Sequence, residues 1–108
     1  MPIDIIIDDN INKYKDIIIK DYPHFEKLYN SIYYKIAKGK KSFILDKEKG
    51  LFLIKEEDLY SDINKPITIT ILYKREAVKT NNNISVCITI KAFRFKDLKK
   101  SKIIISNQ

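Results

Sequence analysis

The stretch from Pro23 to Gly39 constrains the fold of this 108-residue chain more than any other. Large apolar residues recur in it at steps of three and four, the period of one helix face. They are Phe25, Leu28, Tyr29, Ile32 and Ile36. Proline suits the first turn of a helix, and glycine suits the left-handed position that ends one. The sequence therefore predicts a helix from Pro23 to Lys38.

After Gly39 the apolar period changes from helical to strand-like. Apolar segments at 42–45 and 51–54 flank a polar stretch that ends in Gly50, which predicts a hairpin with positive φ at that glycine. Residues 67–71 and 84–90 alternate apolar and polar, and the polar stretch 79–83 separates them as a turn. The acidic stretch 56–66 is predicted to be a loop.

Two further segments add elements at the ends of the chain. Residues 3–7 predict a short strand that stops at Asp8-Asp9, and residues 11–22 predict a helix capped by one of the residues 8–10. Residues 99–108 predict an edge strand or a flexible tail. Together these elements predict a single basic α+β domain over residues 1–108, with one or two N-terminal helices packed on a mainly antiparallel sheet of four to five strands.

Phe93 and Phe95 fall on the opposite parity from the apolar residues of 84–90. A strand side chain changes face when the register slips by one residue. The sequence therefore predicts a bulge near Lys91-Ala92, or a strand whose far end is covered on its other face.

Several catalytic and metal-binding classes are excluded by residue types. Two glycines cannot build a Gly-rich phosphate loop, and a lone Cys87 and a lone His24 cannot supply a multi-ligand metal site. We expect no catalytic residues, no metal and no cofactor, and a protein that is not an enzyme. Two alternatives to a non-catalytic, metal-free protein remain open. A small ribonuclease would use His24, Lys74, Arg75, Glu76 and Arg94, and a Mg²⁺ site would use Glu56, Glu57, Asp58 and Asp62.

The formal charge of +7 is unevenly placed along the chain. Cations gather after the second helix and near the end of the last long strand, where they alternate with Phe93 and Phe95. Cations for phosphates and a ring for bases are the features of a nucleic-acid surface if Phe95 faces solvent; the opposing interpretation places both rings in the core. The predicted nucleic-acid-binding residues are Lys91, Arg94, Phe95, Lys96, Lys99, Lys100, Lys102, Lys40 and Lys41. The expected partner is nucleic acid backbone or an acidic protein surface.

The alternative function is a protein-interaction or homodimeric module, such as an inhibitor of a host protein, that uses a Tyr-rich helical face. Tyr29, Tyr33 and Tyr34 would form that interface, because tyrosine combines apolar area with a hydroxyl that can bond.

No apolar run approaches the roughly 20 residues that a membrane helix needs, and the N-terminus is acidic where a signal peptide is basic. We therefore expect no membrane partner and a cytoplasmic location. The chain holds 22 Ile and 19 Lys but only two Arg, a skew typical of AT-rich coding. A viral or mobile-element origin fits this composition.

Overall fold

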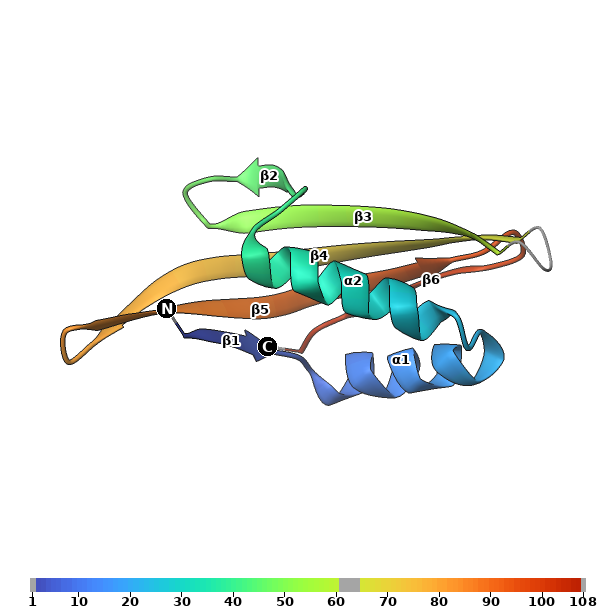
Figure 1. The fold of residues 1–108 in the computed structure, drawn as a ribbon, viewed down its shortest axis with the longest axis horizontal. Coiled ribbons are helices and arrows are strands. Elements are labelled where there is room, and N and C mark those ends of the chain that lie inside the picture. The colour runs from blue at the N-terminus through green and yellow to red at the C-terminus, as the bar shows by residue number, and fades with distance from the viewer. Residues whose placement is uncertain (1, 61–64, 108) are drawn as a thin grey trace.

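The computed structural model describes residues 2–60 and 65–107; of residues 58–60 and 65 it describes the backbone alone. Its elements run in the order β1, α1, α2, β2, β3, β4, β5 and β6 (Figure 1). Their bounds are β1 Ile3–Ile6, α1 Asp9–Asp21, α2 Phe25–Lys38, β2 Phe43–Asp46, β3 Leu51–Tyr60, β4 Lys65–Thr80, β5 Asn83–Lys96 and β6 Ser101–Ile105. The architecture is α+β, as predicted.

One mixed sheet holds the six strands, in the order β1-β5-β4-β3-β2, and β6 pairs with β5 beside β1. The prediction of four to five strands was wrong, because β1 and β6 both pair with β5. Strand β1 runs parallel to β5 along residues 86–89, whereas β6 runs antiparallel to it along residues 92–96. Both short strands thus pair with the same edge of β5, the edge opposite β4.

The helix boundaries follow the local signals in the sequence. Asp8 caps α1, since its side chain accepts a hydrogen bond from the backbone N–H of Asn10. Gly39 ends α2 in the left-handed conformation with φ of 69°, and its N–H bonds to the carbonyl of Ile36. Gly50 also has positive φ, as predicted, and so do Asn81 and Asn82. The turn at these asparagines is shorter than the predicted 79–83, because β4 continues to Thr80.

The core lies between the two helices and one face of the sheet. Both helices and strands β3, β4 and β5 contribute to a single cluster of buried side chains. Several aromatic rings meet there: Phe93 lies within 6.2 Å of the rings of Tyr14, Phe25 and Tyr29, measured between centroids. Burial of rings of this size contributes about 1.5–3 kcal/mol each.

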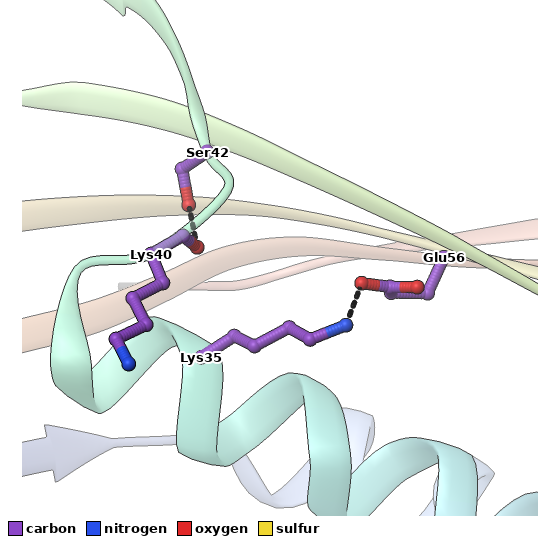
Figure 2. A network of polar contacts seen from close by, with 4 residues as sticks. All are labelled: Lys35, Lys40, Ser42 and Glu56. Carbon is purple, nitrogen blue, oxygen red and sulfur yellow. Dashed lines mark hydrogen bonds and ion pairs between the residues drawn. The ribbon is translucent and has the colours of Figure 1, made fainter.

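Strand β3 corrects the predicted loop at residues 56–66. It continues to Tyr60, and β4 already begins at Lys65; residues 61–64 lie outside the described part. Glu56 occupies an inward position, where an unpaired carboxylate would be costly. Figure 2 shows the reason that it is tolerated: Lys35 extends from α2 and forms an ion pair with it.

Strands β4 and β5 extend beyond the rest of the sheet. The pairing of β4 with β3 ends at Lys74, while its pairing with β5 continues to Thr80. On the other edge β1 pairs with β5 only as far as Val86, so the last residues of β4 and the first of β5 form a two-stranded tip that ends in the Asn81–Asn82 turn (left in Figure 1). The molecule measures 51 × 25 × 22 Å.

Candidate nucleic-acid interface

The two faces of the sheet differ in what covers them. Inward positions of β4, such as Ile69, Ile71 and Tyr73, are fully buried, whereas Thr70 and Leu72 between them are only partly buried. Both described helices contribute to the core on the inward face (Figure 1). We call the opposite side, with Thr70 and Leu72, the uncovered face.

A bulge at Lys91 assigns the residues of β5 to these faces. Leu72 pairs with Ala92 and the next residue, Tyr73, pairs with Ile90, so Lys91 has no opposite residue on β4. The predicted bulge is confirmed. Because of it, Phe93 and Phe95 point toward the helices, and Arg94 and Lys96 lie exposed on the uncovered face.

The burial of Phe95 overturns its predicted role. The side chain has 0% exposure, and its ring packs 5.9 Å from the ring of Phe25 and 5.4 Å from that of Tyr22. A ring enclosed on all sides cannot stack on a base. The prediction that Phe95 contacts nucleic acid was therefore wrong, and the core interpretation was right.

Asp97 builds the turn that joins β5 to β6. Its carboxylate accepts hydrogen bonds from the backbone N–H of Lys99 and Lys100, at 2.8 and 2.7 Å, and from the hydroxyl of Tyr22. Burial alone would raise the pKa of Asp97, but these hydrogen bonds outweigh it and hold the pKa below its usual range. Asp97 is 7% exposed, and both of its carboxylate oxygens accept hydrogen bonds.

Five exposed cations occupy the nine residues around this turn, and we call residues 94–102 the cationic hairpin. They are Arg94, Lys96, Lys99, Lys100 and Lys102. The one carboxylate in the segment is that of Asp97, which is buried. Lys102 lies on the helix side with Nζ 4.8 Å from the centre of the Tyr14 ring, so the hairpin carries positive charge on both faces.

A hollow of about 500 Å³ adjoins Lys91. The turn between β2 and β3 and the neighbouring part of β4 complete its wall, which carries five cations and two carboxylates. These are Lys47, Lys49, Lys74, Arg75, Lys91, Glu48 and Glu76. Lys74 and Glu76 form an ion pair at 3.7 Å, so part of that charge is neutralised locally.

Lys40 and Lys41 lie apart from the cationic hairpin. The hydrogen bond from the Tyr22 hydroxyl to Asp97 places the hairpin near the start of α2, whereas Lys40 and Lys41 follow the end of that helix. A helix of 14 residues is roughly 20 Å long at 1.5 Å per residue. The two lysines are exposed, but they do not extend the same patch.

The tyrosines of α2 do not form the predicted exposed interface. Tyr29 is buried at 5% exposure, and Tyr33 packs edge-on against it with ring centroids 4.5 Å apart. Burial raises the pKa of Tyr29 far above its usual value. Tyr34 is exposed. The prediction of Tyr29 as an interface residue was wrong, because the apolar stripe of α2 faces the core and includes it.

The five ribonuclease candidates are not brought together. Arg75 lies against Gly39 at the end of α2, and His24 is the residue before its start. Lys74 and Glu76 alternate with Arg75 and so lie on the uncovered face. Arg94 shares that face but donates from Nε to the Ser101 hydroxyl at 3.1 Å.

The predicted alternative magnesium ligands also separate. Glu56 points inward and pairs with Lys35, while the next residue, Glu57, is exposed and lies 3.8 Å from Lys55. The side chains of Asp58 and Asp62 lie outside the described residues. Within the part of the chain that is described, no three His, Cys, Asp or Glu side chains gather as metal ligands.

Two features escaped the sequence reasoning. The lysines of the β2–β3 turn, Lys47 and Lys49, join Lys91 only because the fold brings that turn over β4. Strand β2 exposes three consecutive large apolar residues, Phe43, Ile44 and Leu45, at 69%, 62% and 55%. A two-residue period would have indicated that every second one is buried, so the sequence held no signal for this exposure.

Comparison with protein-family models, with curated proteins and with solved structures finds no match to this chain. In the described part of the chain, neither helix has the length and apolar character needed to cross a bilayer.

Proposed function

We propose that this protein binds the phosphate backbone of nucleic acid through the cationic hairpin and the adjoining uncovered face, without catalysing a reaction. The observation that carries the proposal is the grouping of five exposed cations around a turn whose only carboxylate is buried and engaged. Lysine and arginine that neutralise phosphates release condensed counterions, which supplies most of non-specific affinity.

The geometry favours backbone contacts over base contacts. Arg94 and Lys96 are two residues apart on one strand face, about 7 Å at 3.3–3.4 Å per residue, and Lys99 and Lys100 continue the line into the turn. Because Phe95 is buried, the hairpin offers no ring for stacking single-stranded bases. A duplex should therefore bind at least as well as a single strand of the same length.

Charge reversal of the pair Arg94→Glu and Lys96→Glu tests the site. Fluorescence anisotropy with labelled duplex DNA, duplex RNA and single strands measures the affinity. We expect the double variant to lose at least about tenfold in affinity, which corresponds to about 1.4 kcal/mol. The side chains of both residues are exposed, so the fold should be retained.

A matched control is Lys40→Glu with Lys41→Glu, the two exposed lysines that follow the far end of α2. It changes the net charge by the same amount away from the hairpin. If both double variants lose affinity equally, the binding depends on net charge alone and the assignment to the hairpin fails. If the wild-type protein retains no nucleic acid at low salt, the proposed function itself is wrong.

A second candidate function is self-association through the uncovered face. The strand registers align an apolar row across it: Phe43, Leu53, Leu72, Ala92 and Ile105. The two ends of the row are exposed at 69% and 68%. Exposed apolar rows of this kind mark contact surfaces. Light scattering should then show a dimer that Phe43→Ser with Ile105→Ser converts to a monomer, while a monomeric wild-type protein would exclude this candidate.

A further inference from the structure

A second hollow, of about 370 Å³, lies on the helix side of the sheet beyond the end of α2. Its wall includes Lys38 and Gly39 from the helix end, Ser42 from the following loop, and Phe52, Tyr73 and Arg75 from the strands. It contains two cations and no carboxylate. This hollow is distinct from the cationic hairpin, which lies near the start of α2.

Arg75 is the unusual residue of this wall. It follows Tyr73 on the inward side of β4, and its guanidinium reaches Gly39 so closely that a Cβ added there would lie 3.0 Å from Nη1. Nη1 is buried and has no hydrogen-bond partner among the described residues. A buried donor on a charged group without an acceptor is costly, and either a water molecule or an anion that enters the hollow supplies one.

The end of α2 does not supply that acceptor. The carbonyls of Ile36 and Lys35 already accept from the N–H groups of Gly39 and Lys40, at 3.1 and 2.8 Å. The partial negative charge at a helix C-terminus favours a cation nearby and so explains the location of Arg75. It does not provide Nη1 with a hydrogen bond.

The rest of the wall suits an oxyanion with an organic part. The Tyr73 hydroxyl donates to Ser42 Oγ at 2.6 Å, while Ser42 itself makes only a long bond of 3.5 Å to the carbonyl of Lys40 (Figure 2). The Ser42 hydroxyl hydrogen can therefore turn toward an anion. The rings of Phe52 and Tyr73 stack 5.5 Å apart at 17° and form an apolar floor.

We propose that this hollow binds a phosphoryl group, with the Arg75 guanidinium as the bidentate donor and the Ser42 hydroxyl as a further donor. The phosphoryl group comes either from a small soluble phosphate monoester or from the terminal phosphate of a nucleic-acid strand. Lys38 is not assigned as a donor to the phosphoryl group, because its Nζ lies over the Tyr34 ring, 5.8 Å from the ring centre.

Titration with inorganic phosphate at constant ionic strength, followed by the NMR signals of Gly39, Ser42 and the Arg75 side chain, tests the site. We expect saturable shifts confined to these signals. Arg75→Met, which keeps the side-chain length, should weaken binding about tenfold or more, and Ser42→Ala should weaken it less. Lys79→Met, an exposed cation farther along β4, is the control and should leave binding unchanged.

Three outcomes would overturn the proposal: no saturable shift in the wild-type protein, equal weakening by Arg75→Met and Lys79→Met, or shifts spread over the lysines of the whole surface. Should Arg75→Met fail to fold, unchanged binding by Ser42→Ala together with unshifted Arg75 signals in the wild type would equally refute it.

The source of the phosphoryl group is resolved by comparing ribose 5-phosphate with duplexes that carry either a 5′-phosphate or a 5′-hydroxyl. Tighter binding of the phosphorylated end identifies a nucleic-acid terminus, and equal binding of the two ends identifies a small phosphate. The Arg94→Glu and Lys96→Glu variant separates this site from the proposed function, because it should lose duplex binding and keep the phosphate shifts at Arg75.

Discussion

At the scale of single residues, Asp97 is the residue that holds the cationic hairpin in its conformation. Its carboxylate orders the turn and receives the Tyr22 hydroxyl, which ties the hairpin to the junction between the two helices. That hydrogen bond, followed by burial, raises the pKa of Tyr22 to about 12. The ionised carboxylate holds the turn in place and also attracts Lys100, so the positive charge of residues 94–102 is partly offset by Asp97.

Replacement of Tyr22 by Phe tests this contact. A hydrogen bond to a charged group contributes about 1.5–3 kcal/mol, so we expect a loss of this size in the free energy of unfolding at neutral pH. The folded pKa of Tyr22 exceeds the unfolded value of 10.0, so its contribution is complete below pH 10 and is lost as pH rises toward 12. Urea unfolding should show a weaker pH dependence in that window for Tyr22→Phe; an identical dependence would contradict the assignment.

In acid, the contribution of Asp97 to the free energy of unfolding depends on pH with the opposite sign. The folded pKa of Asp97 is lower than its ordinary value of 3.8, so its contribution is present above that pH and disappears as pH falls through the folded pKa. We expect Asp97→Asn to be less stable than the wild-type protein at neutral pH and to lose less stability on acidification below pH 3.8. Circular dichroism of both proteins in urea at several acidic pH values measures this.

Phe95 separates a core role from a binding role. Phe→Ala at a buried site costs about 3–5 kcal/mol, a large part of the stability of a small domain. Phe95→Leu keeps much of the apolar volume, so we expect a lower melting temperature and unchanged affinity for nucleic acid. Selective loss of single-strand binding at full stability would show that the ring is accessible after all.

At the scale of elements, the two glycines with positive φ should respond differently to alanine. A Cβ at Gly50 would lie 2.5 Å from the backbone oxygen of Arg75, which cannot move without breaking the hydrogen bond from Arg75 N–H to the Gly50 carbonyl, 2.8 Å long. A Cβ at Gly39 meets only the flexible end of the Arg75 side chain.

We therefore predict that Gly50→Ala destabilises the protein more than Gly39→Ala. Both variants pay the left-handed backbone cost of roughly 1–2 kcal/mol, and only Gly50→Ala adds a backbone clash. Chemical denaturation of the two variants beside the wild-type protein gives the comparison. Equal losses would mean that the β2–β3 turn can shift away from β4.

Elements that are set by local signals could be predicted from the sequence. Helix α2 carries its own apolar stripe and end, although it begins at Phe25 and not at the predicted Pro23. The bulge at Lys91 was visible as a change of parity before Phe93. The length of β3 was not predictable in this way, because Glu56 is compatible with an inward strand position only through Lys35, 21 residues earlier. The sequence left residues 99–108 open between an edge strand and a flexible tail, and the edge strand is correct over Ser101–Ile105. Because β6 is short and exposed, its place depends on its pairing with β5 rather than on a signal of its own.

At the scale of the whole molecule, the fold places the predicted nucleic-acid-binding cations in separate regions. The predicted grouping of Lys96, Lys99 and Lys100 holds, because these residues are neighbours in sequence and lie in one hairpin. Lys40 and Lys41 belong to another region, because α2 separates them from the hairpin by its full length. The lysines of the β2–β3 turn approach Lys91 through strand pairing alone. Only the part of the candidate site that is local in sequence could be predicted.

The salt dependence of duplex binding tests the central claim most directly. Each phosphate contact contributes about 0.9 to the slope of log affinity against log salt concentration. Neutralising Arg94 and Lys96 to Gln should reduce this slope by about 2, while Lys40→Gln with Lys41→Gln should leave it unchanged. An unchanged slope in the Arg94 and Lys96 variant, with a reduced slope in the Lys40 and Lys41 variant, would contradict the account.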